Sequence, residues 1–470
     1  MNRKLAGVLF LVFLFVGARQ SKATLQAVKI AGVGQAAPGV PGAVFDRFEQ
    51  TPTIDQNGVI TFRAYLHPAT GIVGDGNDEG IWSGTPGNFR LIARENGFVP
   101  TGTPGAAEGA RFGANLIISN VSGHGFSFAS GGVSGSQFIV TSSGLSQVAY
   151  NGMNMGGDPA NPLLFRGLSG PVLALNASGQ YAFGGEFEVG SGGVTDTTKS
   201  GMWANLDGNL KLIARQGSQV DNMPPGTTWS GLFFYPEISD SGEVVFKGVL
   251  SDGRFGIFSF DGVSTHAVAI NTDQVPGAPA GTTFGLLSVN QPRVNSRGDV
   301  VIMGSSKTWL KDASGYRSLP PAGGFVSRPV DVTDDGIVIY HTSSGELNRW
   351  LPNGTIQQVA TSSQYGTLFA PTISSTGFIA FDANDMSLYV AEPGGRPVGV
   401  AGPLGGGFIA SRQFTDVEYS QISAGGDLVF TSGDNTPHEI YFVHVPEPSV
   451  LFVVAAGAAF FRKRVRHRAA

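Results

Sequence analysis

The chain contains no cysteine among its 470 residues. It therefore cannot form a disulfide framework or a cysteine-ligated metal site. Charged residues make up only 14% of the sequence, and no long amphipathic helical pattern occurs. The stability of the fold must come from apolar packing and from backbone hydrogen bonds.

Glycine and the strand-forming residues are what the sequence has in excess. There are 69 glycines and 27 prolines, and aromatic residues account for 10% of the chain. This composition is typical of many short β-strands joined by tight turns. The length suffices for several separate cores or for one large all-β core built from repeated units.

A short kernel recurs along the chain. It reads as an apolar residue, then Asp, Asn, Ser or Thr, two further residues, glycine, and apolar residues two and four places after the glycine, as in residues 54–62 (IDQNGVITF). In the second of eight copies the apolar pair falls one residue late, as an inserted bulge would cause. The kernel glycines are Gly58, Gly123, Gly179, Gly242, Gly298, Gly336, Gly377 and Gly426.

The kernel predicts a hairpin turn followed by a strand with one buried face. The Asx, Ser or Thr side chain can accept hydrogen bonds from backbone N–H groups two residues on. The glycine can adopt a positive φ and close the turn. Apolar residues spaced by two lie on the same face of the outgoing strand.

The repeat predicts an all-β fold, a β-propeller of eight blades, with seven as the alternative count. Each unit offers about four short strands, which is the content of one blade. Residues 25–30 resemble a strand from the end of a unit, and residues 439–443 resemble the strand before it. The N-terminal strand would thus complete the last blade and remove the exposed sheet edges. An open β-array or a pair of sandwiches is the competing architecture, and we expect short hydrophobic helices only at the two termini.

The first 23 residues predict a secretory signal peptide. A basic start at residues 2–4 precedes an apolar run over residues 5–16, and Ser21-Lys22-Ala23 offers a small-x-small cleavage site ending at Ala23. A buried helix of the folded domain is the alternative interpretation. We place the repeat domain at residues 24–444.

Residues 445–470 form a tail in three parts. Pro446-Glu447-Pro448 precedes an apolar run over residues 450–461, which as a helix would span about 18 Å and is too short for the roughly 30 Å hydrocarbon core. A basic end would hold the C-terminus in the cytoplasm, so the tail predicts a transient anchor that awaits processing. The basic residues are Arg462, Lys463, Arg464, Arg466 and Arg468.

This tail resembles the PEP-CTERM sorting signal of Gram-negative bacteria. The resemblance implies two partners, the secretion machinery and an exosortase-type transpeptidase that processes the tail, and a final location at the cell surface or outside the cell. An ordinary C-terminal anchor is the alternative. The kernel at residues 176–183 (NASGQYAF) is similar to the NxxGxxAF tandem repeats of exported proteins, which implies a propeller-like repeat and no particular activity.

The charge of the exported part argues against nucleic-acid binding. Residues 24–446 contain 21 basic and 34 acidic residues, a formal net charge of −13. A body of this charge repels a polyanion.

Few residues suggest chemistry. No pair of histidines has ligand spacing, and no nucleophile elbow or phosphate-binding loop occurs. Asp75, Asn77 and Glu79 match the first half of an EF-hand loop, so a surface Ca²⁺ site is one interpretation and a plain polar loop the other. We expect no other cofactor. The five tryptophans recur with the repeat and are interpreted as core residues, not as sugar-binding platforms.

Two function classes remain after these exclusions. The first is a non-enzymatic surface or matrix protein that presents loops to extracellular polysaccharide or surface proteins, with no catalytic residue assigned. The second is an extracellular propeller lyase or glycoside hydrolase, for which Glu186 and Glu188 could supply paired carboxylates. Carboxylates or Ca²⁺ around a polar axis would favour the enzyme, and an axis closed by apolar side chains would exclude it.

Overall fold

The computed structural model describes most of the repeat domain. The described ranges are 27–68, 71–122, 125–131, 135–232, 236–285, 292–304, 307–319, 326–342, 344–383, 388–401, 422–432 and 439–444. Several predicted features lie outside them: the signal peptide with Ala23, the kernel glycine Gly123, and the tail with Pro446, Glu447, Pro448, Arg462, Lys463, Arg464, Arg466 and Arg468.

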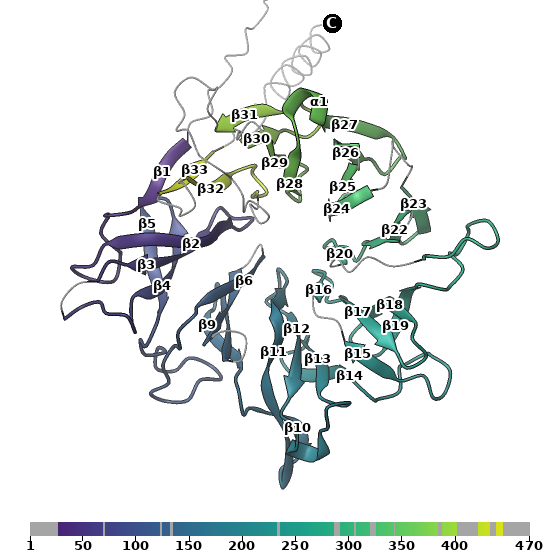
Figure 1. Cartoon of the computed structure of the whole chain (residues 1–470), viewed down its shortest axis with the longest axis horizontal. Coiled ribbons are helices and arrows are strands. Elements are labelled where there is room, and N and C mark those ends of the chain that lie inside the picture. The colour runs from purple at the N-terminus through teal and green to yellow at the C-terminus, as the bar shows by residue number, and fades with distance from the viewer. Residues whose placement is uncertain are drawn as a thin grey trace, which may run out of the picture.

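Eight antiparallel sheets are arranged around a central axis, which confirms the all-β propeller with eight blades (Figure 1). The described chain contains only two helical turns, η1 (Ser191–Gly193) and α1 (Ser362–Tyr365). No helix among the described residues has the length and apolar character needed to cross a bilayer.

The first four blades follow each other in chain order. Blade 1 consists of β2 (Phe45–Ile54), β3 (Ile60–Leu66), β4 (Glu79–Thr85) and β5 (Asn88–Arg94). Blade 2 consists of β6 (Ile117–Ser122), β7 (Gly125–Ser130), β8 (Ser136–Thr141) and β9 (Gly144–Ala149). Blade 3 consists of β10 (Asn154–Asp158), β11 (Asn161–Leu175), β12 (Tyr181–Phe187), β13 (Ser200–Asn205) and β14 (Leu210–Arg215). Blade 4 consists of β15 (Trp229–Leu232), β16 (Glu237–Ile238), β17 (Val244–Leu250), β18 (Phe255–Phe260) and β19 (Thr265–Ile270).

The remaining blades have shorter strands. Blade 5 consists of β20 (Arg293–Val294), β21 (Val300–Met303), β22 (Thr308–Asp312) and β23 (Gly315–Ser318). Blade 6 consists of β24 (Val326–Val332), β25 (Val338–Thr342), β26 (Glu346–Trp350) and β27 (Ile356–Thr361). Blade 7 consists of β28 (Leu368–Ile373), β29 (Ile379–Ala383), β30 (Leu388–Ala391) and β31 (Val398–Ala401). Blade 8 consists of β32 (Leu428–Ser432), β33 (Glu439–Val443) and β1 (Ala27–Gly32).

Blade 8 closes the ring with strands from both ends of the domain. β1 pairs antiparallel with β33, from Ala27 opposite Val443 to Gly32 opposite Glu439. An ion pair of 3.1 Å between Lys29 Nζ and Glu439 Oε1 lies across the same strand pair. The predicted closure by the N-terminal strand is therefore confirmed.

The hydrophobic core lies between neighbouring blades. The cluster between blades 8 and 1, for example, contains Val429 and Ile440 from blade 8 and Phe62 and Trp82 from blade 1. Apolar residues spaced by two on the strand that follows each kernel supply this packing, as the kernel predicts. All five tryptophans are buried, which confirms that they belong to the core: Trp82, Trp203, Trp229, Trp309 and Trp350.

The irregular second kernel forms a blade like the others, and its strand pairing contains a register shift. β6 and β7 stay paired up to Ser122 and Gly125, and their register shifts between Ile118 and Asn120. Asn120 consequently lies within β6, whereas the other kernels place their Asx, Ser or Thr residue after the strand.

Candidate functional site: the axial pocket

The kernel turns of seven blades surround the central axis at one end. The strands that lead into them, such as β16, β20, β24 and β28, lie nearest the centre in Figure 1. They enclose a pocket of about 230 Å³ lined by residues from every blade except blade 2. We call it the axial pocket. Its polar residues are Asp55, Gln56, Asn176, Asp240, Asn295, Ser296, Asp331, Asp334, Thr372, Ser374 and Ser375.

The first polar residue of each described kernel is buried and hydrogen-bonded within its own turn. In all seven, its side-chain oxygen accepts from the backbone N–H four residues on, at 2.8–3.0 Å. Asp55, Asn176 and Asn295 also accept from the N–H two residues on. The sequence predicted only the shorter bond. The bond to the N–H four residues on is the one that all seven share, because the side-chain oxygen of Ser or Thr, as well as that of Asp or Asn, reaches across the five-residue turn. The seven residues are Asp55, Asn176, Ser239, Asn295, Thr333, Ser374 and Ser423.

The kernel glycines also serve the contact between blades. The seven that are described have φ values from 77° to 92°, as predicted. A Cβ at Gly298 would lie 2.7 Å from Oε2 of Glu243, the residue after the kernel glycine of blade 4. A Cβ at Gly426 would lie 2.9 Å from the ring of Phe378, the corresponding residue of blade 7. In these two blades, a side chain of the preceding blade thus covers the kernel glycine.

Asparagine kernels connect adjacent turns directly. Asn176 Nδ2 donates to Ser239 O, and Asn295 Nδ2 donates to Thr333 O, both at 2.8 Å. The aspartate that follows each acceptor completes the junction. Asp240 Oδ1 accepts from Ala177 N at 2.8 Å, and Asp334 Oδ1 accepts from the backbone N–H of the residue after Asn295 at 3.1 Å.

The axial pocket is acidic. Four aspartates line it, and none of its lining residues is Lys, Arg or His. Apolar residues such as Ile54 and Leu175 line it as well, so the axis is not sealed by apolar side chains alone. By the criterion set from the sequence, the carboxylates around the axis favour the enzyme alternative. The four aspartates are Asp55, Asp240, Asp331 and Asp334.

Each of these aspartates has one oxygen engaged by the backbone. Asp331 Oδ1, for instance, accepts from Val332 N at 2.9 Å. Burial is the largest influence on Asp331 and raises the pKa of its carboxyl, which the nearby Arg293 partly offsets. Backbone engagement fixes the carboxylates in place, which suits a preformed binding surface.

An ion pair lies beside the pocket on the inner strands of blades 4 and 5. Arg293 of β20 contacts Glu237 of β16, with Nη1 2.7 Å from Oε1. Burial raises the pKa of Glu237 to about 6, against the opposing effect of the Arg293 charge. A carboxyl that titrates near neutrality is suited to proton transfer, and this observation is the strongest one in favour of the enzyme class.

The predicted Ca²⁺ loop is arranged differently from an EF-hand. Asp75 is exposed, and Asn77 Oδ1 accepts from Gly74 N at 2.8 Å within the loop. Glu79 is only 2% exposed, and its carboxylate pairs with Arg63 Nε at 2.7 Å and accepts from Leu116 N of the next blade. Glu79 is therefore engaged at the junction of blades 1 and 2. Among the described residues, no three His, Asp or Glu side chains are grouped to hold a metal ion.

Glu186 and Glu188 are not paired on a strand. Glu186 lies in β12 beside Lys199 and Arg166, at 3.8 and 3.6 Å, while Glu188 follows the end of that strand. The sequence did not identify Asp240 and Asp334, which lie in the third kernel position, directly after the capping residue. The signal available was that this otherwise variable position carries aspartate directly after Ser239 and Thr333.

Comparisons with known proteins address the fold and the family. A model described as a family of unknown function (DUF7453) matches residues 17–315. Comparison with curated proteins gave no match. Among solved structures, virginiamycin B lyase from Staphylococcus aureus is similar over 90% of this chain and 99% of its own, with 9% identity and a TM-score of 0.34. The WD40 domain of Sif2 is similar over 89% and 98%, with 12% identity and a TM-score of 0.43. Dipeptidyl peptidase 4 of Porphyromonas gingivalis is similar over 77% and 53%, with 10% identity and a TM-score of 0.45.

Proposed function

The chain belongs to the family of unknown function DUF7453, and from its own residues we propose that it is an exported, non-enzymatic binding protein of the cell surface or extracellular matrix. The propeller presents the axial pocket and the surrounding kernel turns to a partner. Extracellular polysaccharide and surface proteins are the partner classes that fit export.

The observation that carries this proposal is the state of the pocket's polar groups. The kernel side chains hold their own turns, and Asp240 and Asp334 hold the neighbouring ones. Groups bound in this way form a rigid polar surface that needs no reorganisation when a ligand binds. Because the lining carries aspartates and no basic residue, it favours a neutral or cationic group of the partner.

Export and sorting are part of the proposal and rest on the two ends of the sequence. The signal peptide would deliver the chain to the secretion machinery, and an exosortase-type transpeptidase would act at Pro446-Glu447-Pro448. Replacement of these three residues by alanine should leave the protein membrane-retained with its tail uncut. Cell fractionation and the mass of the mature protein measure this. Unchanged processing and location would contradict the sorting proposal.

A binding screen tests the binding role. The mature chain is tested against extracellular polysaccharides and surface proteins, and bound material is analysed for chain cleavage. Retention without cleavage supports the proposal. The double variant Asp240→Asn with Asp334→Asn should bind the retained partner more weakly. Turnover of any polysaccharide would contradict it.

The second candidate is a propeller enzyme acting on polysaccharide. The raised pKa of Glu237, close to the axial pocket, favours it. If turnover is found, Glu237→Gln should abolish it, whereas Glu186→Gln, in β12 beside Arg166 and Lys199, should leave it unchanged.

A further inference from the structure

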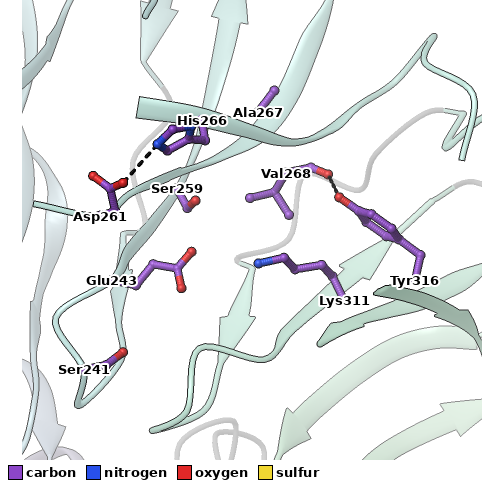
Figure 2. A pocket seen from close by; sticks show the side chains of 9 residues that line it. All are labelled: Ser241, Glu243, Ser259, Asp261, His266, Ala267, Val268, Lys311 and Tyr316. Carbon is purple, nitrogen blue, oxygen red and sulfur yellow. Dashed lines mark hydrogen bonds and ion pairs between the residues drawn. The ribbon is translucent and has the colours of Figure 1, made fainter. Parts of the chain in front are cut away.

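A second hollow opens between blades 4 and 5, and none of its lining residues lines the axial pocket. It has a volume of about 470 Å³ and is lined by nine residues (Figure 2). We call it the blade 4–5 hollow. Glu243 of blade 4 and Lys311 of blade 5 point into it from opposite sides in Figure 2. The figure marks interactions of Asp261 with His266 and of Val268 with Tyr316, and none of Glu243 or Lys311 with the other lining residues.

Lys311 departs from the repeat. It lies in β22 opposite Val300, the residue two places after the kernel glycine of blade 5. The residue at this register is uncharged in each of the other seven blades: Gly84, Val140, Asn205, Phe260, Trp350, Ala391 and Val443. Phe260 is packed in the core between blades 3 and 4. At the next junction the same position carries an ammonium group instead.

The opposite wall of the hollow is polar as well. In blade 3 the residue after this register is Leu206, which packs against the core between blades 3 and 4. In blade 4 it is Asp261, held by the N–H groups of Val263 and Ser264 at 2.9 Å and paired with His266 at 3.0 Å. Asp312, Glu392 and His444 follow the same register in blades 5, 7 and 8, so Lys311 is the position at which this junction differs from the others. Asp261 and His266 are about half exposed, so the polar groups of this junction are accessible to a ligand.

The arrangement is not that of a catalytic triad. Ser264 Oγ and Asp261 Oδ2 both contact Nε2 of His266, at 2.9 and 3.0 Å. A relay needs the serine and the carboxylate on different ring nitrogens. Binding is therefore the role that the hollow supports.

Glu243 and Lys311 define the ligand, because the third charged group of the lining, Asp261, is already paired with His266. The carboxylate of Glu243 lies over Gly298, which has no side chain to displace it. An anionic polymer would be repelled by the −13 charge of the body. A sugar would find one aromatic residue, Tyr316, whose hydroxyl already donates to Val268 O and whose ring packs on Phe284. A neutral ligand that carries both charges matches the hollow best.

We propose that the blade 4–5 hollow binds a small zwitterion of the amino-acid class, with its carboxylate at Lys311 and its ammonium at Glu243. The site is separate from the axial pocket, so neither proposal depends on the other. Charge-assisted hydrogen bonds of this kind each change affinity by about tenfold or more.

The test uses the mature chain and isothermal titration calorimetry with each of the twenty L-amino acids. At least one should bind, and Lys311→Met and Glu243→Gln should each weaken it by about tenfold or more. The double exchange Lys311→Glu with Glu243→Lys should bind more tightly than either single exchange. Lys211→Met is the matched control, since Lys211 of β14 pairs at 2.7 Å with Asp207 in the turn before that strand, in blade 3. It should bind like the unaltered protein.

The outcomes that overturn the proposal are distinct. Absence of binding by every amino acid would overturn it, as would binding that survives Lys311→Met. D-Galacturonate bound as tightly as the best amino acid, and unaffected by Glu243→Gln, would show a simple anion site and would also overturn it. Circular dichroism and thermal melting of each variant establish that a loss of binding is not a loss of fold.

Discussion

The carboxamide of Asn176 donates from Nδ2 to the carbonyl of Ser239, 2.8 Å away and 63 residues further along the chain. Its Oδ1 meanwhile accepts from two N–H groups of its own turn, those of Ser178 and Gln180. One side chain therefore closes a hairpin and joins it to the next blade. Asn295 makes the same three contacts one junction beyond.

Asn176→Ser should separate these two roles. Serine caps the turn in blades 4, 7 and 8, but its hydroxyl does not reach the next blade. Loss of this bond leaves the Ser239 carbonyl with the N–H of Gly242 as its donor, 3.0 Å away, and should lower the free energy of unfolding by about 0.5–1.5 kcal/mol. Guanidinium denaturation measures this. Asn353→Ser is the control, because Asn353 caps only an exposed turn. Equal losses for both variants would refute the role of the junction.

Gly426→Ala should be more harmful than Gly354→Ala. Both glycines have a positive φ, 87° and 85°, so both variants carry the same backbone strain of about 1–2 kcal/mol. A Cβ at Gly354 meets nothing within 4 Å, whereas at Gly426 it lies 2.9 Å from the buried ring of Phe378. The second contact should add about 1–3 kcal/mol. If the denaturation midpoints of the two variants coincide, kernel glycines serve turn geometry alone.

Glu237 should make the protein less stable as the pH rises. Its folded pKa of about 6 lies above its ordinary 4.5, because burial disfavours the carboxylate. Its contribution is therefore fully present below pH 4.5 and is lost as the pH rises through 6, by at most about 2 kcal/mol. Glu237→Gln should flatten this part of the stability profile, measured by denaturation between pH 4.5 and 7.5.

The control for this profile is Glu108→Gln on an exposed loop. It should run parallel to the unaltered protein across the whole range. A Glu237→Gln profile with the same slope as the control would show that this carboxyl is not the group that titrates.

Most of the fold follows from the sequence because the kernel is a local signal. Its capping residue, its glycine and its alternating apolar residues act within nine positions, and the copy around Gly123 gave the eighth blade despite its irregular register. Ring closure followed from the resemblance of residues 25–30 to later strands, since β1 completes blade 8.

The sites required the structure because they depend on contacts between blades. Asp240 and Asp334 act on turns 63 and 38 residues earlier in the chain, and their kernel position looked variable. Lys311 is unusual only when strand register aligns it with residues such as Phe260 and Trp350. The sequence pattern of a Ca²⁺ loop did not show that Glu79 forms an ion pair with Arg63, because Arg63 lies on the preceding strand.

A disulfide across the closing strands should stabilise the whole ring. Val28 and Phe442 are paired on β1 and β33, and Val28 is 53% exposed. Paired Cα atoms in antiparallel strands are about 4.5–5.5 Å apart, which suits a disulfide. Since the chain has no cysteine, Val28→Cys with Phe442→Cys introduces a single possible bond.

Oxidation of this variant should raise its denaturation midpoint above that of its own reduced form. The bond closes a loop that spans nearly the whole domain, so the chain-entropy account gives more than about 4 kcal/mol. The reduced form is the matched control because it already contains the cost of losing the Phe442 ring. Thiol titration checks that both cysteines are consumed. If the two thiols remain free under oxidising conditions, β1 does not pair with β33 in this register, and closure of the ring by the N-terminal strand would have to be abandoned.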